Sequence, residues 1–229
     1  MPGLYLIPTP IAEPFVLPEY LKEIRCFVVE NLREARRFLK WNFKDLDIDA
    51  CLFLEINKNA LDINEIHVFM KNAMAQNSDV GLLSDAGVPC VADPGAVVVE
   101  KAHELGFTVH PLVGPSSLLL ALMASGFNGQ CFAFHGYLPI PENEQIKKIK
   151  SLEEESSKRD MSQLFIETPY RNTKILQQLL ATLNPATRLC VACDLGAATQ
   201  EIISKKVRDW KPEKYNFHKR PAVFLIYAR

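Results

Sequence analysis

The chain has 229 residues, of which 48% are hydrophobic and 23% are charged, as in ordinary globular proteins. Its formal net charge of −1 excludes a polycation that binds nucleic acid through overall charge. The charge is nevertheless uneven: residues 1–112 carry 10 Lys and Arg against 16 Asp and Glu (−6), and residues 113–229 carry 16 against 11 (+5). Either an anionic partner of the second half or two differently charged solvated surfaces would explain this asymmetry.

The sequence predicts neither a membrane segment nor a metal site. It lacks the run of about 18 apolar residues that spans a bilayer. The first residues, MPGLYLIPTPIAEP, lack the basic segment and the apolar core of a secretory signal, so we expect a cytosolic protein. Cys190 and Cys193 form the one close cysteine pair, and no second Cys or His pair follows at zinc spacing.

The first half alternates short apolar runs with helical patterns. Strands are predicted at 4–7, 27–29, 80–83 and 108–113, and helices at 32–39, 63–76, 94–105 and 116–124. Asp62 is expected to cap the second of these helices, and Asp93 the third, with Pro94 as its first residue. Such alternation is typical of an α/β fold with a parallel sheet.

The second half begins in the same way and ends differently. Strands are predicted at 132–134, 163–166, 189–193, 201–204 and 222–227, and helices at 142–157 and 170–183. The late strands have no helices between them, which indicates an antiparallel portion. We therefore expect two α/β domains, 1–113 and 114–229, divided where the sign of the charge changes.

Three loops rich in small or rigid residues follow predicted strands: LIPTP at 6–10, LLSDAGVP at 82–89 and LVGPSS at 112–117. In a parallel sheet such loops gather at one edge and form a crevice. Asp85 lies eight residues before Asp93, too early to cap a helix, so it either forms an Asx-turn or contacts a ligand. Ser116 and Ser117 either cap the next helix or help to receive an anion at its N-terminus.

Two further groups of polar residues follow strands. Glu167, Tyr170 and Arg171 come just after the strand at 163–166, and Glu30 and Arg33 come after the strand at 27–29. Pocket residues and ordinary capping or surface pairs both explain these positions. There is no Walker loop and no GxGxxG fingerprint, so the pattern alone does not select a ligand.

Taken in order, five segments resemble the tetrapyrrole methylase superfamily of methyltransferases that depend on S-adenosylmethionine (SAM). The branch that 2′-O-methylates a cytidine of small-subunit ribosomal RNA is the most similar. The segments are LYLIPTPI at 4–11, LLSDAGVPCVADPG at 82–95, HPLVGPSSLLLALMASG at 110–126, FHGYLP at 134–139 and LFIETPYR at 164–171.

The resemblance implies two α/β domains with SAM in the cleft between them, and a homodimer. By position, it assigns cofactor contacts to Pro8, Asp85, Gly87, Val88, Ser116, Ser117, Phe165, Leu195 and Ala222. A ribose hydroxyl acceptor gains from a general base, for which Glu30, Asp93 and Glu167 are the candidates. Arg33, Tyr170 and Arg171 are expected to contact the acceptor.

Some positions depart from that branch and leave the acceptor open. Asn31 and Leu32 stand where the branch has an acidic residue and a threonine before Arg33. The first loop reads PTPIAEP, where the branch has Gly-Asn after the isoleucine. The chain ends at FLIYAR, whereas longer members of the branch have an additional C-terminal segment. The expected acceptor is RNA or another anion such as a polycarboxylate tetrapyrrole. Two further hypotheses are a non-catalytic module that binds SAM and RNA, and an enzyme that binds a phosphate ligand at residues 114–117.

Overall fold

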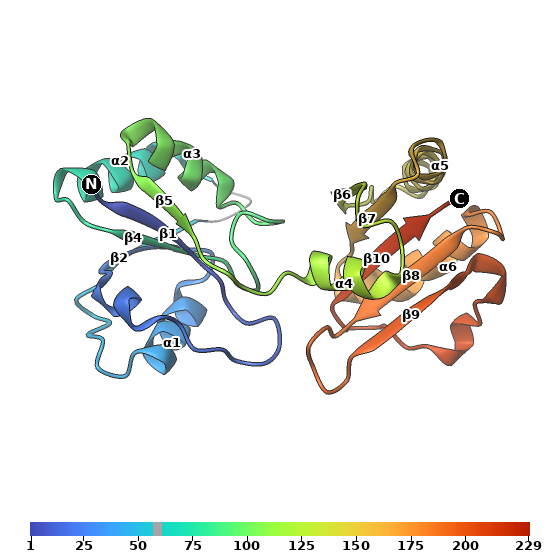
Figure 1. Cartoon of the computed structure of the whole chain (residues 1–229), viewed down its shortest axis with the longest axis horizontal. Coiled ribbons are helices and arrows are strands. Elements are labelled where there is room, and N and C mark those ends of the chain that lie inside the picture. The colour runs from blue at the N-terminus through green and yellow to red at the C-terminus, as the bar shows by residue number, and fades with distance from the viewer. Residues whose placement is uncertain (57–60) are drawn as a thin grey trace. The chain divides into compact units, whose positions relative to one another are not determined.

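The computed structural model describes residues 1–56 and 61–229. The chain divides into two compact units, Met1–Ser116 and Ser117–Arg229, each built around its own five-stranded sheet (Figure 1). The division falls slightly after the predicted one, because the loop that follows the last strand of unit 1 packs with that unit as far as Ser116.

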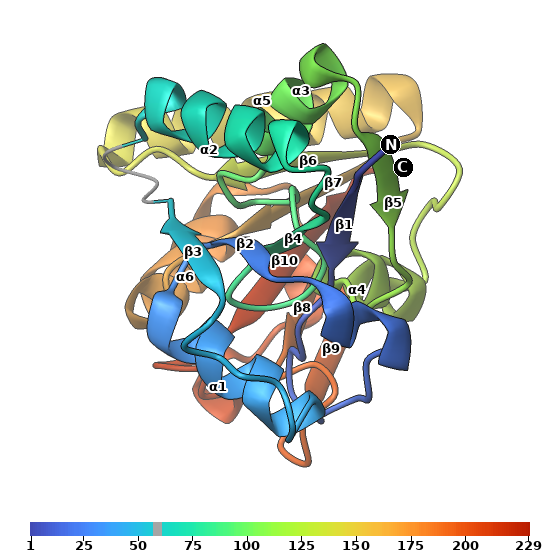
Figure 2. The same cartoon turned by 90° about the vertical axis from the view of Figure 1, so that its left-hand side faces the viewer.

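Unit 1 is a parallel sheet covered by helices on both faces. Its strands are β1 (Gly3–Ile7), β2 (Cys26–Val29), β3 (Leu52–Glu55), β4 (Val80–Leu83) and β5 (Thr108–Pro111), in the order β3-β2-β4-β1-β5. Its helices are α1 (Leu32–Asn42), α2 (Ile63–Ala75) and α3 (Ala96–Leu105), with a short 3-10 helix at Glu19–Glu23. Figure 2 shows α2 and α3 on one face of the sheet and α1 on the other.

The side chains of each strand in unit 1 serve two cores. Val28 and Leu82 pack with α2 and α3, whereas Phe27 and Leu83 pack with α1. Burial on both faces is the reason that the central strands are continuous apolar runs, without the alternation of a half-exposed strand.

Unit 2 has a mostly antiparallel sheet. It contains α4 (Ser117–Ser125), β6 (Phe132–Tyr137), α5 (Glu142–Arg159), β7 (Ser162–Ile166), α6 (Asn172–Thr182), β8 (Arg188–Cys193), β9 (Glu201–Lys206) and β10 (Ala222–Tyr227), with 3-10 helices at Pro169–Arg171, Val207–Asp209 and Pro212–Lys214. The order is β6-β7-β10-β8-β9, and only β6 and β7 are parallel. Helices α5 and α6 share a core with Phe165 and Phe224, while the Ser204 hydroxyl donates to the carbonyl of Ser125 at the end of α4.

The α/β class, the parallel first sheet and the antiparallel late strands confirm the fold expected from the sequence. Strand β3 was not predicted, because it is an edge strand whose first residue, Leu52, is exposed and whose pattern is irregular. The helix predicted from residue 170 is a 3-10 turn followed by α6, and the strand predicted to reach residue 113 ends at Pro111.

The expectation that Asp93 caps α3 is wrong. The helix begins at Ala96 and its N-cap is Gly95. Cys90 and Ala92 adopt positive φ angles of 70° and 67°, so the chain turns tightly before the helix. The Asp93 carboxylate closes this turn by accepting hydrogen bonds from the backbone N–H groups of Cys90 (2.9 and 2.8 Å) and Gly95 (2.7 Å).

Within residues 1–56 and 61–229, no helix combines the length and the apolar character needed to cross a membrane. The same residues contain no group of three or more His, Cys, Asp or Glu side chains that could hold a metal ion.

Candidate functional site

The loops that follow β1, β4 and β5 are bonded to one another at the carboxyl edge of the parallel sheet. The N–H of Thr9 donates to the carbonyl of Gly87 (2.9 Å), and the N–H of Gly87 donates back to Thr9 (3.1 Å). The N–H of Val88 donates to the carbonyl of Pro115 (3.1 Å). The loop after β4 therefore holds both of the others, and the three form one structure, the loop cluster (residues 8–9, 84–88 and 114–116).

Two glycines allow the close approaches within the loop cluster. A Cβ atom at Gly114 would lie 2.1 Å from Cβ of Pro8, far inside the 3.4–4 Å of an ordinary contact. Gly87 has a φ of +84°, and a Cβ there would lie 3.1 Å from the carbonyl oxygen of Pro115. Glycine is the residue that tolerates both conditions, since it has no Cβ and adopts positive φ readily.

The buried Thr9 side chain fixes the inside of the cluster. Its hydroxyl donates to the carbonyl of Ser84 (3.1 Å), and the Ser84 hydroxyl donates to the carbonyl of Gly87 (3.1 Å). The sequence pattern indicates no role for Thr9, and it indicates one for Gly114 only as part of the segment 114–117 that one hypothesis assigns to a phosphate ligand. The sequence did contain a signal for both residues, because each stands beside a rigid proline: the polar Thr9 in PTP and the small Gly114 in VGP.

Carboxylates gather where the loop after β4 meets the start of α1. A Glu30 carboxylate oxygen accepts from the N–H of Asp85 (2.9 Å), and Asn31 caps α1 by accepting from the N–H of Glu34 (3.2 Å). Partial desolvation raises the pKa of Asp85 although the residue is largely exposed, and the negative charges of Glu34 and Glu55 raise that pKa further. Asn31, which departs from the family pattern, thus has a local structural role.

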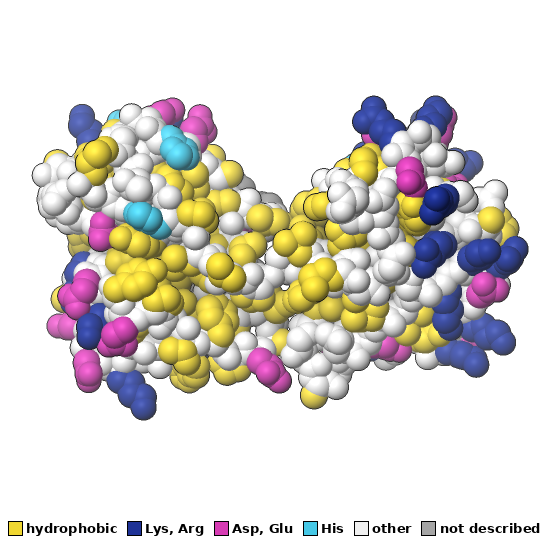
Figure 3. Space-filling view, viewed as in Figure 1, with side chains coloured by type: hydrophobic (Ala, Val, Ile, Leu, Met, Phe, Trp, Pro, Cys, Tyr) yellow, Lys and Arg dark blue, Asp and Glu magenta, His cyan; other side chains and the backbone are white. Residues whose placement is uncertain are grey.

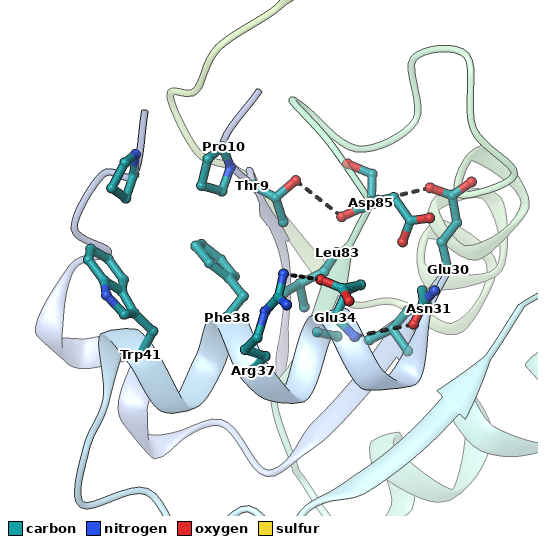
Figure 4. A pocket seen from close by; sticks show the side chains of 14 residues that line it. Thr9, Pro10, Glu30, Asn31, Glu34, Arg37, Phe38, Trp41, Leu83 and Asp85 are labelled. Carbon is teal, nitrogen blue, oxygen red and sulfur yellow. Dashed lines mark hydrogen bonds and ion pairs between the residues drawn. The ribbon is translucent and has the colours of Figure 1, made fainter. Parts of the chain in front are cut away.

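A cavity of about 350 Å³ lies between α1 and these loops (Figure 4). Glu30, Glu34 and Asp85 line one part of it, and Pro10, Pro14, Phe38 and Trp41 line another. Arg37 also lines the cavity, and its guanidinium is ion-paired with Glu34. Of the cofactor contacts expected from the sequence, Asp85 is the one that lines it.

A separate group of polar residues follows β7 in unit 2. Glu167 is buried and forms an ion pair with Arg171 (3.2 Å between Oε2 and Nη1), while its Oε1 is buried without a hydrogen-bond partner among the described residues. Burial raises the pKa of Glu167, and the positive charge of Arg171 opposes that rise. Tyr170 is 69% exposed, and its ring lies near the His218 ring (6.0 Å) and the Lys219 ammonium (5.7 Å).

The structure brings together one set of the predicted site residues. Within unit 1, one edge of the sheet carries Pro8, Glu30, Asp85, Gly87, Val88 and Ser116. Arg33, in the first turn of α1, does not line the cavity and lies in a shallow depression with Glu55. The carboxylate of Asp93 is engaged in the turn before α3.

The remaining predicted residues belong to unit 2. Ser117 is the first residue of α4, and Phe165, Leu195 and Ala222 are buried. The Phe165 ring stacks on Phe224 with centroids 5.6 Å apart, so its side chain is part of the core of unit 2.

The chain is similar in sequence to curated proteins named ribosomal RNA small subunit methyltransferase I. It is 30% identical over 204 residues to the Bacillus subtilis protein, covering 87% of this chain and 66% of the relative. It is 26% identical over 231 residues to that of Buchnera aphidicola (subspecies Schizaphis graminum), covering 97% and 77%, and 28% identical over 234 residues to that of Vibrio cholerae, covering 99% and 77%. No protein-family model matches the chain.

The fold is similar to those of solved methyltransferase structures. The methyltransferase CobJ aligns with a TM-score of 0.63 and 16% identity over all of both chains. Uroporphyrin-III C-methyltransferase from Thermus thermophilus, complexed with S-adenosylhomocysteine, aligns with a TM-score of 0.55 and 16% identity, covering 98% of this chain and 97% of that one.

Proposed function

We propose that this chain, which belongs to the tetrapyrrole methylase superfamily of SAM-dependent methyltransferases, methylates RNA of the small ribosomal subunit on a ribose 2′-oxygen. The similarity to ribosomal RNA small subunit methyltransferases over nearly the whole chain is the observation that carries this proposal. The loop cluster supports it, because it joins three of the segments on which the family resemblance rests.

The residues of the loop cluster fit SAM. The exposed Asp85 carboxylate can accept hydrogen bonds from an amino or hydroxyl group. Because Gly87 has no side chain, a ligand can approach the backbone of Gly87 and Val88 closely. We assign Pro8 and Ser116 to the same cofactor site, and Ser117, Phe165, Leu195 and Ala222 to a contribution from unit 2. When bound, SAM supplies a methyl group that its sulfonium already activates for displacement.

The protein must then orient the acceptor and remove its proton. In-line transfer requires the attacking oxygen at about 3–3.5 Å from the methyl carbon. We assign the general base to Glu30, because its carboxylate lines the cavity and is held beside the loop cluster by the N–H of Asp85. Glu167 is the alternative, since burial raises its pKa above the ordinary value for glutamate and a raised pKa makes a carboxylate a better proton acceptor. Asp93 is less suited, because both of its oxygens serve the turn before α3.

The charge of unit 2 suits the phosphates of RNA. Residues 117–229 carry 16 Lys and Arg against 11 Asp and Glu, a net of +5, and Figure 3 shows many of the basic side chains on the visible face of this unit. Tyr170 offers an exposed ring beside Lys219, a combination that stacks a base and attracts a phosphate. We assign Tyr170 and Arg171, and Arg33 of unit 1, to RNA contacts.

A cytosolic homodimer completes the proposal. Leu119 and Met123 of α4 are 51% and 78% exposed, and exposed apolar side chains on one helix are typical of a protein interface. Sedimentation equilibrium of the purified chain tests this part: a dimer is expected, and a monomer at micromolar concentration contradicts it.

The activity is tested with methyl-labelled SAM and two acceptors in separate reactions, small ribosomal subunits from cells that lack the gene and a polycarboxylate tetrapyrrole. Ribonuclease-sensitive label that resists alkaline cleavage at one nucleotide supports the proposal, because a 2′-O-methyl group blocks that cleavage. Label in a tetrapyrrole and none in RNA contradicts it in favour of a ring C-methyltransferase. SAM binding by calorimetry without transfer to either acceptor indicates a non-catalytic module.

A further inference from the structure

The cavity in unit 1 has one wall suited to a planar ring. Phe38 and Trp41 lie three residues apart on α1, so they share a face of the helix. Figure 4 shows the Phe38 ring opposite Pro10, and Pro14 also lines the cavity. Trp41 is 51% exposed, a large exposure for an indole that has no binding role. The volume of about 350 Å³ lies at the lower end of the range for small-molecule sites.

The other wall accepts hydrogen bonds and repels anions. Glu30, Glu34 and Asp85 supply carboxylates, and among the lining residues that the structure describes Arg37 is the one cation. Its charge is paired with Glu34. A phosphate or a polycarboxylate would face three carboxylates against one cation here, whereas N–H donors would meet acceptors.

The cavity also adjoins the cofactor loops. Thr9, Ser84 and Asp85 belong to the loop cluster and line the cavity as well. Gly87 and Val88 do not line it, so of the proposed cofactor contacts in the loop after β4 only Asp85 borders the cavity, and the part beside Glu34 and Phe38 is left to a second molecule.

From these observations we infer that the cavity binds a nucleobase that carries an exocyclic amino group, stacked on Phe38 and Trp41 with its amino edge toward the Glu34 carboxylate. This inference rests on the proposed function, since it takes RNA as the acceptor. Cytosine, adenine and guanine each present an amino group, whereas uracil has none, and its one N3–H donor stands between two carbonyl oxygens that the carboxylate would repel.

The test measures binding without methyl transfer. Cytidine, adenosine, guanosine and uridine are titrated separately into the full-length protein, and binding is followed by tryptophan fluorescence and by ligand-observed NMR. At least one amino-bearing nucleoside is expected to bind at least fivefold more tightly than uridine. Trp41→Ala is expected to weaken that binding at least fivefold, because the base loses one of the two aromatic side chains on which it stacks. Glu34→Gln is expected to reduce the preference over uridine.

Controls separate this site from the cofactor site and from general damage. Tyr20→Ala removes a comparably exposed aromatic of unit 1 that does not line the cavity, and it should leave nucleoside binding unchanged. SAM affinity should stay within twofold in Trp41→Ala and Glu34→Gln. A parallel loss of SAM affinity would assign the cavity to the cofactor and overturn the inference.

Other outcomes also decide the question. Equal binding of uridine, tighter binding of uroporphyrin than of any nucleoside, or no saturable nucleoside binding at millimolar concentration each contradicts the inference. If the wild-type protein methylates RNA, and Trp41→Ala matches it both in methylation and in nucleoside affinity, the inference fails and the proposed function stands. If selective nucleoside binding is found but RNA is not methylated, the proposed function fails and the cavity assignment stands.

Discussion

Substitution of Gly114 by alanine tests whether the loop cluster is the cofactor site. The added Cβ would lie 2.1 Å from Cβ and 2.5 Å from Cγ of Pro8. An ordinary contact begins at 3.4 Å, so Pro8 and residue 114 must separate by about 1.3 Å, the difference between 3.4 Å and 2.1 Å. The proline ring is fused to its own backbone and cannot rotate away, so the two loops themselves must move apart.

Two measurable effects follow from this displacement. Overpacking of this kind costs about 1–3 kcal/mol, and each kcal/mol lowers Tm by about 2–4 °C for a chain of 150–250 residues. Because the Val88–Pro115 and Thr9–Gly87 hydrogen bonds hold the same junction, the shift also displaces the proposed SAM contacts. We expect SAM affinity to fall at least tenfold, which corresponds to about 1.4 kcal/mol.

The measurements are isothermal titration calorimetry with SAM and thermal unfolding by circular dichroism. Gly129→Ala is the matched control, because a Cβ at Gly129 meets no atom within 4 Å. That variant should retain both the wild-type SAM affinity and the wild-type Tm. If Gly114→Ala also retained both, the close packing of the loops would have no role in binding SAM and the reasoning would be refuted.

Three further predictions concern carboxylates of the candidate sites. Asp85→Ala should weaken SAM binding more than tenfold in a calorimetric titration with little change in Tm, since the side chain is exposed; unchanged affinity contradicts the cofactor assignment. Asp93→Ala should lose about 1–3 kcal/mol in urea unfolding, because the N–H groups of Cys90 and Gly95 lose their acceptor; full stability with lost turnover would instead identify Asp93 as the base. The pKa of Glu167 in the folded protein is raised above its ordinary value of 4.5, so protonated Glu167 stabilises the folded state relative to the ionised form. This contribution to the free energy of unfolding is fully present below pH 4.5 and is lost as the pH rises through the folded pKa. The stability of wild type relative to Glu167→Gln should therefore fall with rising pH over that range, and a constant or rising difference in urea unfolding would contradict this sign.

The fold was predictable to the extent that it depends on neighbours along the chain. Strand β4 was expected and found at Val80–Leu83, because a short apolar run needs only its own sequence to favour a buried strand. Asp62 was expected to cap α2, and its side chain accepts from the N–H groups of Asn64 (2.9 Å) and Glu65 (3.2 Å). Both the donor and the acceptor of each bond lie within three residues, so the pattern specifies them.

Local pattern misled where a turn had an unusual backbone. The pair Asp93-Pro94 has the composition of a helix start, yet α3 begins only at Ala96. The positive φ angles of Cys90 and Ala92 have no signature in those residue types, since glycine is the usual residue in that conformation. Asp93 therefore performs a different task from the one that its neighbours in sequence suggest.

By itself the sequence determined the α/β class, the family and the loops that carry the family resemblance, because periodicity and motifs are properties of consecutive residues. The tertiary structure alone decided that Gly114 must lack a Cβ because Pro8 lies against it, and that Phe38 and Trp41 face the loop after β1 to make a cavity. Each of these contacts joins segments far apart in the chain, and such contacts exist only once parallel pairing of β4, β1 and β5 has brought the loops to one edge.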